Sequence, residues 1–255
     1  MDLFKRRLNK CHQDWQCFVN MGMKFRRLFR DERKLACFYL ATLPKRRGLA
    51  FDIGANRGNY SKVLGSLFER VIALEPQQRL LPEIRRNIRR FGNIELVNCA
   101  VSDHEGTAPM FLSMNHELSS LNRNWMQSVQ TSGRFSDIRW DETVEVPTTT
   151  LKQLVQKFGV PDFIKIDTEG NERKVLTTLD CKVPLFSLEI IPENNTETLQ
   201  IINHLESIAP CSYNLALGEE PCWAFAQARP AETVISFLRS TFSPPAWADL
   251  YVQMV

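Results

Sequence analysis

The sequence predicts a single α/β domain with a mostly parallel sheet, and three observations lead to this prediction. From residue 49 onwards, short apolar runs alternate with amphipathic helical segments, which is the pattern of a parallel sheet covered by helices. The first apolar run is followed by a glycine-containing loop and a helix. With 255 residues and 44% apolar content, the chain can bury one such core.

The first unit, residues 49–68, is the one around which the rest is organised. Leu49–Ile53 fits a strand buried on both faces, and Tyr60–Phe68 has its apolar residues at helical spacing. Gly54 and Gly58 between them allow a sharp turn and close approach of a ligand to the main chain. The next helix directs its first amide groups at the same place. This order predicts a nucleotide-binding cradle.

The spacing of the loop indicates which nucleotide it binds. A dinucleotide fold would have G-x-G-x-x-G, whereas this loop has one glycine fewer and Asp52 before the first. The Asp52 carboxylate would repel a pyrophosphate but attract the ammonium and sulfonium groups of S-adenosylmethionine (SAM). Glu75, at the end of a second predicted strand and about 20 residues further on, is placed to accept the ribose hydroxyls. A generic turn with a surface glutamate is the alternative.

An amphipathic helix and a third strand are predicted next. Gln77–Phe91 has one apolar face and ends before Gly92. Its other face, which we expect to be the solvated side, carries Arg85, Arg86, Arg89 and Arg90. Ile94–Val101 is the predicted third strand, and Asp103 after it is expected to accept the exocyclic amine of adenine. The alternative for Asp103 is a turn residue before Gly106.

The segment 107–150 interrupts the alternation of strands and helices. Ala108–Ser113 and Thr143–Thr148 are β-like runs that we expect to pair, and Met114–Asp141 between them is polar and predicted to be a loop. A loop of this length inside a compact domain is usually functional, so we expect an acceptor lid. Its candidates for contacting the acceptor or the cofactor are His116, Ser119, Ser120, Asn122 and Arg123. A lone histidine in a polar loop is more often solvent-exposed than catalytic.

A second chemical centre follows the fourth predicted strand, Phe163–Ile166. Methyl transfer from a sulfonium is an in-line displacement that also requires removal of the acceptor's hydroxyl proton. Asp167 or Glu169 could take that proton or hold the acceptor, with Lys165 paired to one of them. Alternatively, Glu169 merely favours the start of the next helix. Asp167 with Glu189 would be only a pair of carboxylates, so no metal site is predicted, and a divalent ion at this pair is the alternative.

The C-terminal third completes the alternation. The apolar periodicity predicts a fifth strand, an amphipathic helix and a closing strand pair that brackets a further helix. These are, in order, Leu185–Ile191, Glu197–Ile208, Cys211–Leu217 with Ala248–Val255, and Ala231–Leu238.

The order of short motifs resembles the FkbM family of SAM-dependent methyltransferases. These motifs are Phe51-Asp-Ile-Gly-Ala-Asn-Arg-Gly58, Ala73-Leu-Glu-Pro76, Asn98-Cys-Ala-Val-Ser-Asp103, Ser119-Ser-Leu121, Val144-Glu-Val-Pro-Thr-Thr-Thr-Leu151 and Asp162-Phe-Ile-Lys-Ile-Asp-Thr-Glu-Gly170. Each is ordinary alone, but six in this order are specific. The resemblance runs from about Leu49 to Ile191 and leaves the first 48 residues uncovered.

The resemblance implies a class I methyltransferase fold, which is a Rossmann-like sheet of about seven strands with the last strand antiparallel. It also implies SAM as the cofactor and O-methylation of a sugar, glycolipid or small natural product. Asp167, Glu169 and Lys165 would then act near the acceptor hydroxyl. The cofactor would be held by Asp52, Gly54, Ala55, Asn56 and Gly58 at its methionine end, by Glu75 and Pro76 at the ribose, and by Asp103 at the adenine.

Residues 1–48 are predicted to be a basic helical extension of the domain at 49–255. Residues 1–50 hold 13 lysines and arginines against four acids, which is a net +9 and leaves −6 for the remainder of a chain of net charge +3. A helical cap with a solvated basic face is the plainest interpretation. Contact with an anionic membrane surface is an alternative, and nucleic acid could meet the same charges.

Two further expectations concern location and function class. The seven cysteines have irregular spacing without C-x-x-C, and neither a spanning segment nor a secretory signal is predicted, so we expect reduced thiols and a cytoplasmic protein. An RNA methyltransferase that uses the basic arm is an alternative, although the absence of an Asn-Pro-Pro-aromatic run makes a nucleobase acceptor unlikely. A non-catalytic SAM-fold binding module is another, and a nicotinamide dehydrogenase is disfavoured by the loop spacing.

Overall fold

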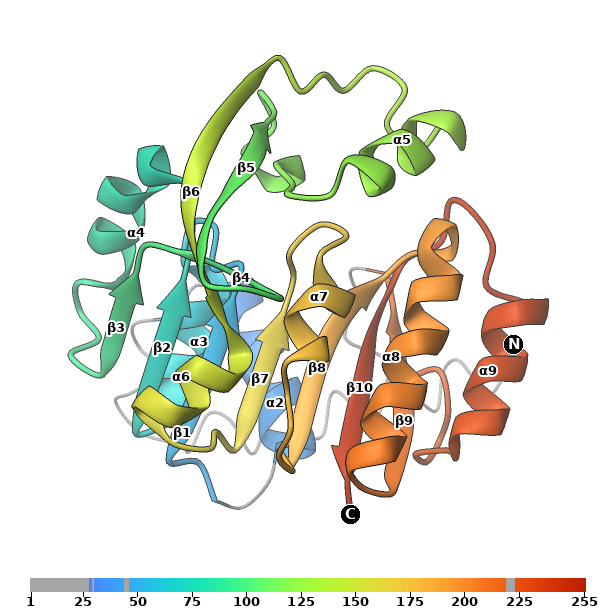
Figure 1. Ribbon diagram of the computed structural model, residues 1–255. Coiled ribbons are helices and arrows are strands. Elements are labelled where there is room, and N and C mark those ends of the chain that lie inside the picture. The colour runs from blue at the N-terminus through green and yellow to red at the C-terminus, as the bar shows by residue number, and fades with distance from the viewer. Residues whose placement is uncertain (1–27, 29, 44–45, 219–222) are drawn as a thin grey trace.

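The computed structural model describes residues 28, 30–43, 46–218 and 223–255; residues 1–27, 29, 44 and 45 of the predicted helical extension lie outside this part. The centre is a seven-stranded sheet in the order β3-β2-β1-β7-β8-β10-β9 (Figure 1). Its strands are β1 (Leu49–Ile53), β2 (Arg70–Leu74), β3 (Ile94–Val97), β7 (Phe163–Ile166), β8 (Leu185–Ile190), β9 (Cys211–Leu217) and β10 (Ala248–Met254). β10, the last strand of the chain, runs antiparallel to β8 and β9, and all other pairs are parallel. The predicted α/β fold is confirmed.

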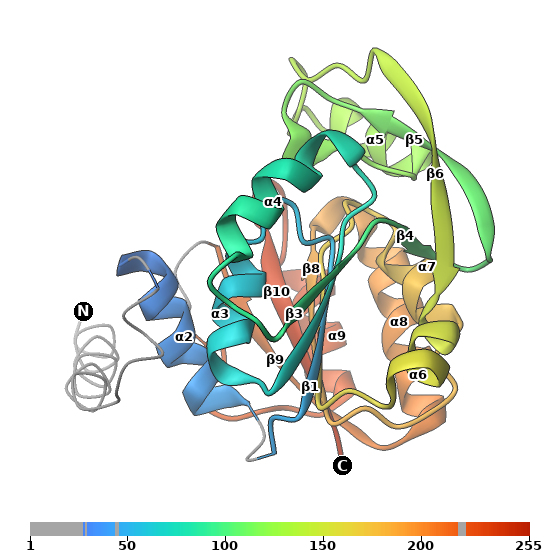
Figure 2. The same cartoon turned by 90° about the vertical axis from the view of Figure 1, so that its left-hand side faces the viewer.

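Helices cover both faces of this sheet (Figures 1 and 2). One face is covered by α2 (Arg30–Thr42), α3 (Asn59–Leu67) and α4 (Leu81–Ile88), and the other by α6 (Leu151–Phe158), α7 (Glu172–Thr177), α8 (Asn195–Ile208) and α9 (Ala231–Ser240). Although α2 falls in the predicted extension, its Ala36 and Tyr39 belong to the same buried cluster as Val63 and Leu64 of α3, as does Leu43 directly after it. α2 therefore forms part of the core.

A second, smaller sheet rises above the first. It consists of β4 (Ala100–Ser102), β6 (Glu142–Thr150) and β5 (Gly106–Leu112), in that order. The antiparallel β5–β6 pair confirms the predicted pairing of the two β-like runs. The single third strand predicted at Ile94–Val101 is wrong, because Asn98 Nδ2 donates to the carbonyl oxygens of Glu75 (2.8 Å) and Pro76 (3.0 Å). This turn takes the chain out of the main sheet to pair with β6.

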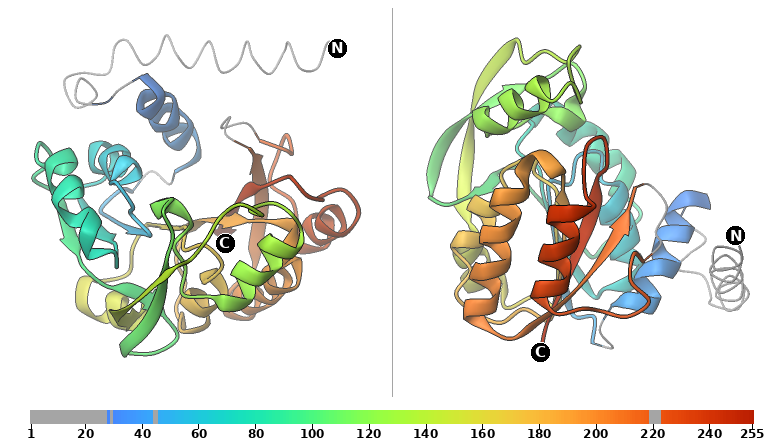
Figure 3. Two further views of the ribbon diagram at one scale, coloured as in Figure 1. Left: turned by 90° about the horizontal axis from the view of Figure 1, so that it is seen from above. Right: turned by 90° about the vertical axis from the view of Figure 1, so that its right-hand side faces the viewer.

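The segment predicted to be a loop, Met114–Asp141, is called the lid here. It contains a 3-10 turn, η3 (His116–Leu118), and the helix α5 (Arg123–Thr131). Asn122 Oδ1 caps the start of α5 by accepting hydrogen bonds from the amides of Asn124 and Trp125. α5 buries Trp125 and Val129 against Ile191. The lid is thus a packed element above the carboxyl ends of the parallel strands (Figure 3).

Within the described ranges, no helix has the length and apolarity needed to cross a bilayer. Of the cysteines in those ranges, Cys37, Cys99, Cys181 and Cys211, none forms a disulfide.

Candidate active site

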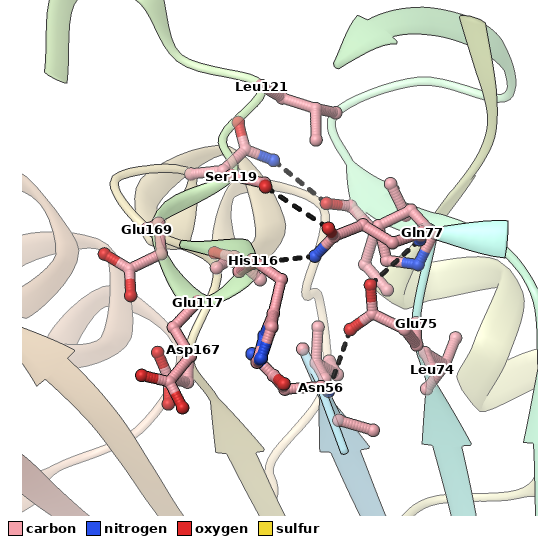
Figure 4. A pocket seen from close by; sticks show the side chains of 18 of the residues that line it. Asn56, Leu74, Glu75, Gln77, His116, Glu117, Ser119, Leu121, Asp167 and Glu169 are labelled. Atoms are coloured by element: carbon pink, nitrogen blue, oxygen red, sulfur yellow. Dashed lines mark hydrogen bonds between the residues drawn. The ribbon is translucent and has the colours of Figure 1, made fainter. Parts of the chain in front are cut away.

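A cavity of about 270 Å³ lies at the carboxyl ends of β1, β2 and β7, beneath the lid (Figure 4). In open α/β sheets ligands bind at this edge. Eight of the predicted site residues line the cavity: Gly54, Ala55, Asn56, Glu75, Pro76, Lys165, Asp167 and Glu169. Asp52, Gly58 and Asp103 are not part of its wall.

The glycine loop is pressed against the end of β7. Gly54 has a φ of 83°, and a Cβ added to it would lie 1.7 Å from the carbonyl oxygen of Asp167. The amides of Gly54 and Ala55 both donate to the carbonyl oxygen of Leu74, at 3.0 and 2.9 Å. Only glycine fits this position, so the loop and the second chemical centre form one wall.

Asp52 and Gly58 support the loop from outside the cavity. Gly58 precedes α3 with a φ of 78°, and a Cβ there would lie 3.2 Å from Ile88 of α4. Asp52 is fully buried; Ser61 Oγ donates to its Oδ2 at 2.5 Å, and its Oδ1 has no partner. Burial raises the pKa of the Asp52 carboxyl. Contact of Asp52 with the cofactor's ammonium stays a prediction.

Glu75 is fixed at the end of β2 and faces the cavity (Figure 4). Its two carboxylate oxygens accept the amides of Asn56 and Gln77, each at 2.8 Å, and the residue is 3% exposed. Burial raises the pKa of Glu75 to about 7, against the lowering effect of the hydrogen bonds from Gln77 and Asn56. Each oxygen keeps a lone pair for a ligand hydroxyl.

Gln77, which the sequence analysis did not select, joins this end of the cavity to the lid. Its Nε2 donates to the carbonyl oxygen of His116 at 2.9 Å, and its Oε1 accepts from Ser119 Oγ at 3.2 Å. Both lid residues line the cavity (Figure 4). Nothing in the sequence marks Gln77 except its position two residues after Glu75.

Three carboxylates meet on the other side of the cavity. One oxygen each from Asp167, Glu169 and Glu189 lies within 4.8 Å of the others, whereas the sequence suggested only the pair Asp167 and Glu189. Oxygen ligands of this kind could hold a divalent cation. However, the buried Lys165 already donates to Asp167 Oδ2 at 2.7 Å, with its ammonium 4.1 Å from the centre of the Tyr60 ring.

This carboxylate group favours bound protons or bound positive charge. Burial raises the pKa of both Glu169 and Glu189, and repulsion from Asp167 adds to the effect on both, as does repulsion from Glu189 on Glu169. Glu172 on α7 and Asp249 on β10 contribute further negative charge. A cation that enters the cavity therefore stabilises the ionised carboxylates.

The lid is fastened to the peptide that carries Glu169. Ser120 Oγ donates to the Glu169 carbonyl oxygen at 2.6 Å, and Asn122 Nδ2 donates to that of Gly170 at 2.5 Å. Gly170 has a φ of 89°, and a Cβ there would lie 2.2 Å from Trp125 Cγ. Glu169 itself has a φ of 54°, which is rare for a residue with a side chain and is held by this packing.

The lid candidates therefore divide into two groups. His116 and Ser119 line the cavity, and burial lowers the pKa of His116, whose Nδ1 has no partner. Ser120 and Asn122 are not in the cavity wall and hold the main chain instead. Arg123, also outside the wall, stacks over the Phe111 ring at 4.4 Å.

Asp103 lies at the surface beyond β4. Its Oδ1 is 2.8 Å from His104 Nδ1, and its side chain is 43% exposed. The nearby cavity wall is formed by Val101 and Asn171, whose Nδ2 donates to the Val101 carbonyl oxygen at 3.0 Å and whose Oδ1 has no partner. The adenine role of Asp103 stays a prediction.

Comparison with known proteins gives a family match. The model described as the methyltransferase FkbM domain matches residues 52–212, and no curated protein sequence matches the chain. A precorrin-6Y C5,15-methyltransferase from Geobacter metallireducens GS-15 is similar in structure, with 12% identity, a TM-score of 0.45, and 88% of this chain and 89% of that chain covered. A putative RNA methyltransferase from Pyrococcus horikoshii has 10% identity and a TM-score of 0.44, with 93% and 91% covered.

Proposed function

The chain belongs to the FkbM family of methyltransferases, and from this premise we propose that it transfers a methyl group from SAM to a hydroxyl of a sugar, glycolipid or small natural product. One observation carries the proposal: a single cavity contains both the glycine loop with Glu75 and the carboxylates that follow β7. Groups that could bind SAM and a carboxylate that could accept the hydroxyl proton therefore line the same cavity.

The residues present fit SAM. The carboxylate of Glu75 has lone pairs for the two ribose hydroxyls, and the close approach at Gly54 leaves main chain rather than side chain facing the ligand. The unpartnered Oδ1 of Asn56 is a hydrogen-bond acceptor in the same wall. The carboxylates near Lys165 outnumber its single positive charge, which suits a cationic cofactor. We infer that the buried carboxylate of Asp52 attracts the ammonium group of SAM electrostatically from behind the glycine loop.

The reaction needs alignment and one proton transfer. SAM supplies an electrophilic methyl group on a sulfonium. The acceptor oxygen would take this methyl group as the electron pair of the carbon–sulfur bond returned to sulfur, and a carboxylate of this chain would accept the hydroxyl proton. Glu169 is our choice for that carboxylate, because Lys165 already donates to Asp167. Lys165 then orients Asp167, and the lid excludes water.

The first test is calorimetric titration of the purified protein with SAM and, separately, with NAD. We expect micromolar binding of SAM and none of NAD. Glu75→Ala should weaken SAM binding at least about tenfold, since removing hydrogen bonds to a charged group costs on the order of 1.5–3 kcal/mol. Glu145→Ala, which makes the same change at an exposed glutamate outside the cavity wall, is the matched control and should bind like the wild type.

Acceptor identity is tested by transfer of a radiolabelled methyl group from SAM to panels of sugars, glycolipids and small hydroxylated natural products. Labelling of one of these panels, lost in Glu169→Gln with SAM binding retained, would support the proposal. Labelling of RNA alone would contradict it. Absence of SAM binding by folded protein would remove its basis.

A further inference from the structure

The exposed side of α4 and the turn directly after it carry four arginines. Arg85 and Arg86 of α4, and Arg89 and Arg90 of that turn, are all exposed, while Ile84 and Ile88 on the opposite face are buried and fix the helix to the sheet. The Arg86 side chain is 69% exposed, 3.8 Å from Glu83. In the described part of the chain, no ion pair joins Arg85 or Arg89 to a carboxylate. This face, called the arginine face here, is basic within a region of net charge −6.

The arginine face stands beside the cavity. Asn87 Nδ2 of α4 donates to the carbonyl oxygen of Arg57 at 2.9 Å, and Arg57 lines the cavity. Just before α4, Arg79 donates to the carbonyl oxygen of Ser113 at 2.8 Å. The next residue, Met114, is 94% exposed and is an unbranched apolar side chain. The start of the helix and the chain segment that carries Met114 are therefore held next to each other.

The partner must be anionic, and the surroundings favour a lipid surface over a nucleic acid. Proteins that bind single-stranded nucleic acid stack bases on exposed aromatic rings, but the large apolar side chains exposed in the described part, Met114, Val160, Leu217 and Val255, include no aromatic residue. A flat membrane can instead meet a protruding helix, with arginines at the phosphate groups and an apolar side chain entering the interface. Each such basic residue contributes about 1 kcal/mol of attraction to an anionic leaflet.

We propose that the arginine face of α4 docks the protein on an anionic phospholipid surface. Because α4 borders the cavity, docking places the cavity next to the bilayer. This inference does not depend on the acceptor.

The test is co-sedimentation of the full chain with vesicles of phosphatidylcholine alone or with added phosphatidylserine. The variant Arg85→Glu/Arg89→Glu is compared with Arg229→Glu/Arg239→Glu, which makes the same charge change at exposed positions beside β9 and on α9. We expect the wild type to bind only the anionic vesicles. The α4 variant should bind about 30-fold or more weakly, from two or more kcal/mol lost, while the control variant binds normally. Arg85→Gln/Arg89→Gln should show a smaller loss.

Two measurements keep the result interpretable. Neither Arg85 nor Arg89 lines the cavity, so a folded variant should bind SAM like the wild type. SAM titration and thermal melting of each variant therefore check that it is folded. Equal vesicle binding by the α4 and control variants would assign binding to another part of the chain and overturn the proposal. Retention of a single-stranded RNA that depends on Arg85 and Arg89, without vesicle binding, would also overturn it.

Discussion

At the scale of single residues, we expect Glu75 to make both the stability of the protein and its affinity for SAM depend on pH. Its folded-state pKa is about 7, against an ordinary value of 4.5. Between pH 4.5 and pH 7 the Glu75 carboxyl therefore keeps its proton in the folded protein but loses it in the unfolded chain. The contribution of this residue to stability is fully present below pH 4.5 and is lost as the pH rises through 7, by about 3 kcal/mol in total.

We expect Glu75→Gln to remove this part of the pH dependence, because the glutamine amide does not titrate. The measurement is urea unfolding of the SAM-free protein at pH 5.5 and pH 8, with Glu117→Gln as control. In the same range SAM affinity of the wild type should rise with pH, since the ionised carboxylate is the better acceptor for ribose hydroxyls. An unchanged slope in Glu75→Gln would mean that other groups cause the dependence.

Gly54 tests the contact between the loop and β7. In Gly54→Ala the new methyl group would meet the carbonyl oxygen of Asp167, and a φ of 83° strains any residue with a side chain. We expect a loss of about 3 kcal/mol or more in the free energy of unfolding, together with loss of SAM binding. Gly92→Ala, which meets no atom within 4 Å, should stay within about 0.5 kcal/mol. A Gly54→Ala protein with wild-type stability would contradict the close approach.

At the scale of elements, Arg134 fastens the lid. Its guanidinium donates to both carboxylate oxygens of Glu193, at 2.9 and 3.0 Å, and to the carbonyl oxygens of Pro245 and Ala246. The two side chains are only 9% and 5% exposed. Removal of the arginine leaves a buried carboxylate without its counter-charge, so Arg134→Ala should destabilise the protein by about 3–5 kcal/mol.

Amide hydrogen exchange would identify the part of the protein that Arg134→Ala destabilises. We expect amides of α5 to exchange faster in Arg134→Ala, while those of β1 and β7 change little. Lys152→Ala breaks an ion pair with Asp180 whose side chains are 52% and 59% exposed, and it should cost less than about 1 kcal/mol. Unchanged exchange in α5 would show that the lid is held by its apolar cluster alone.

At the scale of the whole molecule, the boundary between the N-terminal extension and the domain can be tested by truncation. Tyr39 of α2 is fully buried, and its ring centre lies 5.4 Å from that of Phe163 in β7. Removal of residues 1–27 leaves this contact, whereas removal of residues 1–48 exposes it. We therefore expect the shorter truncation to melt like the full chain and to bind SAM, and the longer one to melt at least several degrees lower. Equal melting of both would restrict the core to residues 49–255.

The sequence by itself determined the elements whose signals are local. The strand Phe163–Ile166 was predicted with its observed bounds, because a short apolar run bounded by charged and turn residues has few alternatives. The glycine loop and Glu75 were found for a similar reason: a strand, a loop and a helix specify their own geometry within some 25 residues, and both line the cavity.

Only the tertiary structure decided how distant segments combine. Asn98 ends β3 by binding the main chain after β2, Gln77 binds a lid some 40 residues away, and Glu169 joins Asp167 and Glu189 through a left-handed main-chain conformation that the lid holds in place. The sequence could not show these contacts, because the free energy of each comes from groups far apart in the chain that the fold alone brings together.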